Sequence, residues 1–167
     1  MDQPLILRIE FAPPPAEASS ETLATITLST DAHGIKHSGD LLQNPLNEEE
    51  EERLRWYLEE YWKWPYEQFR QRAGEVEELL PEIGQRLYKA ISDSAGAQRV
   101  LSPWSLQPEK DRQISIISDI PRVLSLPWEL LHDGERFLVR DGVLDLARST
   151  PDETFPTAPP EDRKSVV

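Results

Sequence analysis

The sequence predicts an α+β or α/β fold, with a mixed sheet covered by amphipathic helices. Runs within residues 5–29 alternate apolar and polar residues with a period of two, which is the pattern of half-buried strands, and residues 112–148 contain further strand-like runs. Between them, residues 47–93 repeat apolar side chains at helical spacing. The 167 residues suit one domain and are enough to bury a core of their own.

The N-terminal strands are expected to pair as an antiparallel ribbon. The first run places Leu7, Ile9 and Phe11 on one face. Three consecutive prolines then stop it, because proline cannot donate to a strand ladder. The second run, residues 22–29, is rich in β-branched side chains. Residues 31–40 are interpreted as a polar connection to the helical section.

The helical section has a clear start. Asn47 can cap a helix, and Glu50 follows three residues later, which is the spacing of a capping box. The acidic run 48–52 lies on the first turns, where the helix dipole favours negative charge, so it needs no ligand. Further on, Pro81 predicts a kink or a new first turn. Gly84 predicts close packing against a neighbouring element.

The C-terminal section is predicted to hold a strand, a short helix and a β-hairpin. Residues 112–118 form the strand, and Pro127 suits the first turn of the short helix because its missing N–H is not needed there. Asp141 and Gly142 lie between two strand-like runs, and this pair tolerates the positive φ of a type I′ turn. They therefore predict the hairpin.

Composition limits the cellular location and the kinds of partner that are expected. Residues 1–149 are predicted to form one domain, and the Pro-rich residues 150–167 a flexible tail or linker. The formal net charge of −13 repels phosphate backbones, so nucleic-acid binding is not expected. The N-terminus lacks signal-peptide features, and no apolar run approaches the ~20 residues of a membrane span. A cytoplasmic protein that does not bind membranes is expected.

No catalytic, cofactor or metal site is assigned. The chain has no Cys, which excludes a thiolate ligand or nucleophile from it. His33 and His37 are four residues apart, but this spacing alone is a weak metal motif. His132 is expected to cap the short helix, because a cation is favourable near a helix C-terminus. A carboxylate-dependent hydrolase remains an alternative, and it requires a carboxyl group whose pKa is raised by its surroundings.

Aromatic residues are dense and have two readings. They can fill the core, or they can form an exposed surface that anchors a protein partner, since Trp and Tyr are enriched at interface hot spots. The predicted interaction surface consists of Trp56, Trp62, Trp64, Tyr66, Trp128 and Phe137.

One segment carries a family resemblance. Residues 126–131 (Leu-Pro-Trp-Glu-Leu-Leu) form its centre. With residues 82–88, 113–116, 137–138 and 147–149, they resemble the N-terminal region of CHAT-domain proteins, which are bacterial caspase-like proteins often found beside helical repeat arrays. The resemblance implies an α/β caspase-like sheet and peptide-bond hydrolysis by a His/Cys dyad. In that family the His and Cys motifs lie further downstream, so no catalytic residue is carried over.

The sequence therefore predicts a truncated, non-catalytic N-terminal portion of a CHAT caspase-like protease, inactive alone. Its expected role is to scaffold the protease core or to connect it to a partner, which would be the catalytic half, a repeat domain or a second copy. The chain ends about where the family's first core strand is expected. The alternative is a free-standing interaction module that shares the scaffold and has no enzymatic activity.

Overall fold

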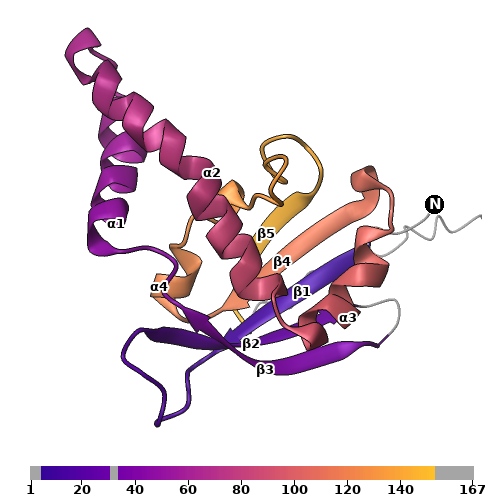
Figure 1. Cartoon of the computed structure of the whole chain (residues 1–167). Helices are drawn as coiled ribbons and strands as arrows, with labels where there is room; N and C mark the ends of the chain where they lie inside the picture. The colour runs from indigo at the N-terminus through magenta and orange to yellow at the C-terminus, as the bar shows by residue number, and fades with distance from the viewer. Residues whose placement is uncertain (1–4, 31–33, 153–167) are drawn as a thin grey trace, which may run out of the picture.

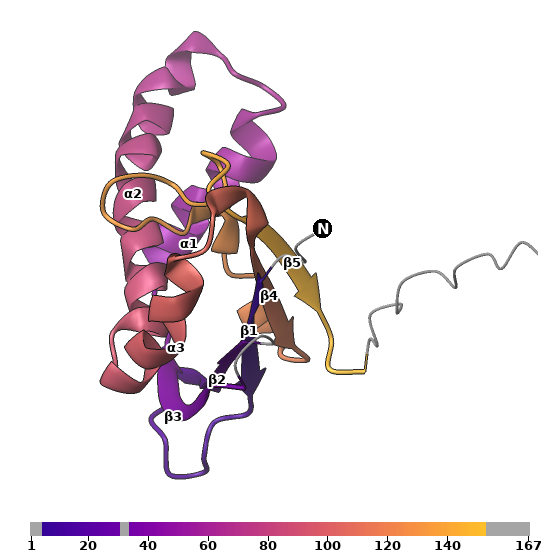
Figure 2. The same ribbon diagram turned by 90° about the vertical axis from the view of Figure 1, so that its right-hand side faces the viewer.

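The computed structural model describes residues 5–30 and 34–152. They form an α+β fold of two layers, with a five-stranded mixed sheet and helices packed on one of its faces (Figure 1, Figure 2). The predicted fold class is confirmed. From edge to edge, the sheet contains β3 (Lys36–Gln43), β2 (Thr22–Thr30), β1 (Leu5–Ala12), β4 (Arg112–Ser118) and β5 (Asp145–Ser149).

The N-terminal ribbon has the predicted pairing. Strands β1 and β2 are antiparallel, with Ile9 opposite Leu28. Alternate residues of both strands are buried on the face toward the helices, and Leu7, Ile9 and Leu28 have no exposed surface. Alternation with a period of two therefore predicted these strands correctly.

Strand β3 corrects the expectation of a polar connection over residues 31–40. It pairs antiparallel with β2 and contains irregularities of register. Residues 36–43 show no alternation of apolar side chains because β3 is an edge strand, where charged and polar side chains are normal. Leu42 is its buried apolar residue, whereas Lys36, Ser38 and Gly39 are exposed.

The predicted C-terminal hairpin is wrong. Strand β5 pairs parallel with β4, with Ile116 opposite Arg148, and no strand precedes it in residues 136–144. Gly142 does adopt the positive φ, +73°, that the Asp-Gly pair predicted. This residue lies in a loop, not in a hairpin turn. The apolar side chains of the loop, Leu138, Val143 and Leu144, are buried against the core.

Four helical segments follow β3 and form an antiparallel pair that extends beyond the sheet (Figure 1). We call residues 48–80, which make up its projecting part, the arm. Glu67–Phe69 (η2) is a single 3-10 turn near its far end. The other segments are α1 (Glu48–Arg55), the π-helical η1 (Trp56–Tyr61) and α2 (Arg70–Ser92).

The predicted capping box at the start of α1 is confirmed. The Glu50 N–H donates to Asn47 Oδ1 at 2.8 Å, and the Asn47 N–H donates to Glu50 Oε2 at 3.1 Å. Arg86 of α2 binds the same carboxylate, with Nη2 2.8 Å from Glu50 Oε1. Hydrogen bonding from Arg86 outweighs burial and holds the pKa of Glu50 below its usual value. The base of the arm is therefore tied to α2.

Helix α2 runs through Pro81 as one element of 23 residues, so the predicted new helix start is not present. Its two halves pack in different places. Ala73 and Val76 pack with Trp56 in the small core of the arm, whereas Ile83 and Leu87 lie in the main core. Packing on both sides of Pro81 offsets the hydrogen bond that proline cannot make.

The segment 124–134 contains less helix than predicted. The one-turn helix α4 (Pro121–Leu124) comes first, and Trp128–Leu130 (η4) is a single 3-10 turn after Pro127. Trp128 is fully buried, packs 5.3 Å from the Phe11 ring centre, and donates from Nε1 to the Val123 carbonyl at 2.8 Å. The remaining helical segments are α3 (Ala95–Ser105) and the 3-10 turn η3 (Glu109–Asp111).

Close packing at Gly84 is confirmed. A Cβ atom added there would lie 1.9 Å from the Leu130 carbonyl oxygen, and the His132 N–H donates to the Gly84 carbonyl at 3.2 Å. Helix α2 thus meets the η4 segment backbone to backbone. Any side chain at this position would have to push the two elements apart.

We expect Gly84→Ala to lower the free energy of unfolding by about 3 kcal/mol, because overpacking against backbone has no flexible side chain to absorb it. Urea unfolding measures the change. Gly74→Ala is the matched control: it lies in the same helix with nothing within 4 Å of an added Cβ. It should stabilise the protein by about 0.5–1 kcal/mol, as Ala does in helix interiors. Equal effects of both substitutions would contradict the close contact.

Candidate interaction surface

The structure divides the six predicted surface aromatics into two groups. Trp56, Trp128 and Phe137 are buried, with 9%, 0% and 7% of their surface exposed. These three predictions are wrong for this chain, because each ring is used in packing. Trp56 packs within the arm against Phe69, with Arg72 stacked 3.9 Å from its ring centre. Phe137 packs edge-on against His132.

The other three aromatics remain on the surface. Trp62, Trp64 and Tyr66 expose 73%, 61% and 53% of their area. They occupy the connection between η1 and η2, at the end of the arm farthest from the sheet (Figure 1). The Trp64 and Tyr66 rings stack with their centres 6.2 Å apart. We call Trp62, Trp64 and Tyr66 the aromatic surface.

The arm holds the aromatic surface in place through a small core of its own. Tyr57 and Tyr61 stack with ring centres 5.7 Å apart, and Trp56 packs beside them. The Tyr57 hydroxyl donates to Glu77 Oε1 at 2.9 Å across the arm. Burial, followed by this bond to a carboxylate, raises the pKa of Tyr57 to about 12. The phenol therefore remains a proton donor at neutral pH.

A groove runs between the arm and the segment 121–127, with a cavity volume of about 680 Å³. Its sides come from residues far apart in the sequence, which is why sequence reasoning missed it. Leu58 stands at the open side with half of its surface exposed. The apolar residues that line the groove are Leu46, Leu54, Leu58, Pro121, Leu126 and Pro127.

Two ion pairs lie along the groove. Arg122 Nη2 is 3.0 Å from Glu51 Oε1, so this pair joins α4 to α1. Arg148 of β5 binds Glu129, with Nη2 2.7 Å from Oε2. Burial, the largest influence on Glu129, raises its pKa, but the hydrogen bonds from Arg148 and the backbone hold it below the usual value. In each pair, an arginine of this chain neutralises a glutamate of the same chain.

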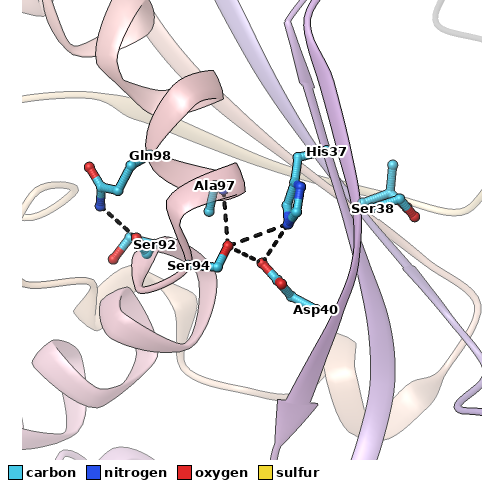
Figure 3. Close-up of polar contacts among 8 residues, drawn as sticks. His37, Ser38, Asp40, Ser92, Ser94, Ala97 and Gln98 are labelled. Atoms are coloured by element: carbon cyan, nitrogen blue, oxygen red, sulfur yellow. Dashed lines mark hydrogen bonds and ion pairs between the residues drawn. The ribbon is translucent and has the colours of Figure 1, made fainter.

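A separate polar cluster joins β3 to the start of α3 (Figure 3). Asp40 Oδ2 accepts a hydrogen bond from Ser94 Oγ at 2.5 Å and lies 3.0 Å from His37 Nε2. Ser94 Oγ is 3.4 Å from the same ring nitrogen, and it accepts a bond from the Ala97 N–H at 3.0 Å. Ser94 is the N-cap of α3.

These residue types match a hydrolytic triad, but their geometry does not. A triad needs serine at one imidazole nitrogen and the acid at the other, so that histidine takes the serine proton. Here Ser94 and Asp40 both approach Nε2 of His37, and Ser94 donates directly to the acid. A Cβ at Gly96 would lie 2.1 Å from the His37 ring, so the ring rests on the first turn of α3. The cluster caps and positions that helix.

His132 also differs from expectation. Its Nδ1 accepts a hydrogen bond from the Gly134 N–H at 3.0 Å, so the ring caps a turn, not a helix. His33 lies outside the described residues. Within residues 5–30 and 34–152, no group of three or more His, Asp or Glu side chains is placed to hold a metal ion.

A carboxylate-dependent hydrolase gains no support from the described carboxyl groups. Such an enzyme needs one carboxyl with a raised pKa, so that it can donate a proton at neutral pH. Every shift resolved among these groups is downward, because hydrogen bonds from donors outweigh burial. The groups are Asp40, Glu50, Glu129 and Asp133.

Comparisons with known proteins identify no family for this chain. No protein-family model, curated protein or solved structure matches it. Among the described helices, none combines the length and the apolar composition that spanning a membrane requires. The candidate site therefore rests on geometry: an exposed aromatic surface at the end of the arm and an apolar groove beside it.

The Asp40 cluster predicts a pH dependence. Burial, the largest influence, raises the pKa of Asp40, but hydrogen bonds from Ser94 and His37 bring it below the usual 3.8. A carboxyl with a depressed folded-state pKa stabilises the fold above its unfolded pKa of about 3.9 and loses this contribution as pH falls through the folded value. Between pH 6 and pH 3, the wild type should therefore lose more stability than Asp40→Asn.

Urea unfolding at both pH values measures the difference. Asp119→Asn is the control, because Asp119 is an exposed carboxyl in the loop after β4. The control should follow the wild type. If Asp40→Asn lost as much stability as the wild type, the carboxylate would not hold β3 and α3 together.

Proposed function

We propose that this chain is a non-catalytic protein-interaction scaffold that binds a protein partner through the aromatic surface. The observation that carries the proposal is the exposure of Trp62, Trp64 and Tyr66 close together in the chain at the end of the arm, with the Trp64 and Tyr66 rings stacked. Single exposed apolar residues are ordinary, but a contiguous apolar group on the surface marks an interaction site. Trp and Tyr are also the residues that contribute most at interface hot spots.

Packing within the arm supports the same role. The Tyr57 and Tyr61 rings stack within η1, and the Tyr57–Glu77 hydrogen bond joins η1 to α2 next to the aromatic surface. A surface fixed before binding loses less conformational entropy when a partner orders it. An arm of this kind presents large rings to a partner without requiring the sheet to rearrange.

The resemblance to CHAT-domain proteins gives the proposal a specific form. The chain would be the non-catalytic N-terminal portion of a cytoplasmic caspase-like protease, and its partner would be the catalytic half, a repeat domain or a second copy. A thiol protease needs a thiolate paired with a base, and this chain has no Cys to supply one. The parallel arrangement of β1, β4 and β5 agrees with the α/β sheet that the resemblance implies.

A free-standing adaptor is the second candidate, and the burial of residues 126–131 favours it. Leu126, Trp128 and Leu131 expose 4%, 0% and 0% of their surface, so this segment is satisfied by the chain's own core. A portion that depends on a missing half would leave such a segment uncovered. Light scattering of the purified chain separates the two candidates, because only the dependent portion should associate into oligomers.

Site-specific photo-crosslinking tests the proposed surface. A photoreactive amino acid at position 64 should capture one discrete protein in producing cells, whereas the same group at position 106 should not. Leu106 is the matched control because it is 85% exposed and lies outside the aromatic surface. With the captured protein purified, the Trp62→Ala/Trp64→Ala double variant should raise Kd at least about tenfold, as loss of a hot spot does. Unchanged affinity in the double variant would contradict the proposal.

Catalysis is tested separately. The purified chain should hydrolyse no member of a panel of fluorogenic peptides above the background rate. A turnover that survives repeated purification would exclude the non-catalytic role. A turnover that disappears on purification would come from a contaminating peptidase and leave the proposal standing.

A further inference from the structure

We infer that the aromatic surface binds a proline-rich segment in the polyproline II conformation, and that residues 156–160 of a second copy of this chain supply it. The inference rests on the proposed function and names the partner of the same surface. Three features carry it: the way two of the rings are fixed, the hydrogen-bond donors that the rings leave free, and a proline-rich run in the chain's own sequence.

A tight turn around Pro65 fixes two of the rings. The Tyr66 N–H donates to the Trp64 carbonyl at 2.8 Å, which closes the turn, and proline holds its own φ at about −65°. The two flanking rings stack with their planes 14° apart. The Trp64 N–H also donates to the Tyr61 carbonyl at 3.2 Å, and the Tyr66 ring centre lies 6.4 Å from that of Phe69. The turn is therefore attached to η1 on one side and to η2 on the other.

The exposed rings offer both kinds of contact that a polyproline II helix uses. Their flat apolar faces can pack against the rings of proline, and their polar groups can donate hydrogen bonds. Within residues 5–30 and 34–152, the indole N–H groups of Trp62 and Trp64 and the hydroxyl of Tyr66 make no hydrogen bond. A polyproline II helix has no internal hydrogen bonds, so its carbonyl groups accept bonds from such donors. Proline-rich segments dock on aromatic surfaces in this way.

Other ligand classes fit the tip of the arm less well. A cage for a methylated ammonium group needs rings that face one another across a space, whereas Trp64 and Tyr66 stack on each other. The charges at the tip have both signs and do not select a charged ligand. Arg70 Nη2 pairs with Glu67 Oε2 at 2.9 Å, and Lys63 is a further basic residue among acidic neighbours. An uncharged segment rich in rigid rings therefore suits this surface best.

The sequence of this chain contains such a segment. Residues 156–160 are Pro-Thr-Ala-Pro-Pro, an uncharged run with Pro-x-x-Pro spacing, and they lie outside the described residues. Proline-rich composition favours the polyproline II helix, so little conformational entropy is lost on binding. The other proline run, residues 13–15, is less available. Pro14 is partly buried, and the Pro15 carbonyl already accepts a hydrogen bond from the Ala18 N–H at 3.0 Å.

A second copy has to supply the segment. Pro156 follows Asp152 by four positions, which span at most about 14 Å. The first turn of α2 alone lies about 20 Å from the contact at Gly84, and β5 runs away from the tip of the arm (Figure 2). The segment therefore does not reach the aromatic surface of its own copy. Binding between copies is a head-to-tail contact, so association increases with concentration.

A peptide of residues 150–163 tests the recognition step. Its binding to the purified full chain is measured by fluorescence anisotropy, and the control peptide carries Ala at positions 156, 159 and 160. The control retains Phe155 and every charge, and it should bind at least about tenfold more weakly. Trp62→Ala/Trp64→Ala should weaken binding of the natural peptide by a similar factor. Leu106→Ser, which removes an exposed apolar side chain elsewhere, should leave Kd within about twofold.

Two variants of the full chain test the source of the segment. Pro156→Ala/Pro159→Ala/Pro160→Ala keeps the aromatic surface, and Trp62→Ala/Trp64→Ala keeps the segment. In sedimentation-velocity ultracentrifugation the wild type should associate as its concentration rises, whereas each variant should stay monomeric. An equimolar mixture of the two variants should form a dimer and nothing larger, because each supplies the half of the contact that the other lacks. A restored dimer also shows that both variants are folded.

Equal binding of the two peptides, or a mixture of the variants that stays monomeric, would overturn the inference. Association that persists in both variants would come from another surface and would also overturn it. The proposed function fails separately. Under the inference, the protein captured by crosslinking at position 64 is a second copy. If a different protein were captured there and Trp62→Ala/Trp64→Ala released it, the inference would fail while the proposed function stood.

Discussion

The backbone contact between Gly84 and Leu130 determines how α2 packs against the segment 124–134. At this point α2 approaches the η4 segment with no side chain between them, and the His132 N–H bonds to the Gly84 carbonyl. Because α2 is one continuous helix, its orientation at this contact also sets the position of its first turn, about 20 Å away. The direction of the arm is therefore decided within the core of the domain.

The arm extends from this contact to the exposed aromatic surface. Its own small core around Trp56 is separate from the main core. Some aromatic residues of the arm therefore pack inside it, while others lie exposed at its end. The salt bridge from Arg86 to Glu50 fixes α1 against α2 at the base. With both helices fixed, the second apolar face of α1 and η1 faces the segment 121–127 across an open space, and the groove is the result.

The cluster of His37, Asp40 and Ser94 shows why residue types do not identify a site. Ser94 Oγ donates its hydrogen bond directly to the Asp40 carboxylate, and the same Oγ is occupied as the N-cap acceptor of α3. His37 fills the space above Gly96 at the first turn of that helix. The same residues that could activate a nucleophile are used to attach the edge strand β3 to a helix.

Features governed by near neighbours could be predicted from the sequence. The alternation of β1 and β2 and the Asn47 capping box depend on residues a few positions apart, and both agree with the structure. Gly84 was also informative, because a glycine inside an apolar helix face indicates a close approach. These signals were sufficient for the fold class.

Features governed by distant residues were decided only in the tertiary structure. The parallel pairing of β5 with β4 replaces the hairpin that Asp141 and Gly142 favour locally. The burial of Trp128 depends on Phe11, more than a hundred residues earlier, and the groove exists because Leu54 and Leu126 are brought together. A sequence pattern records which side chains avoid water, but not which distant surface covers them, since that choice is made by the packing of the whole chain.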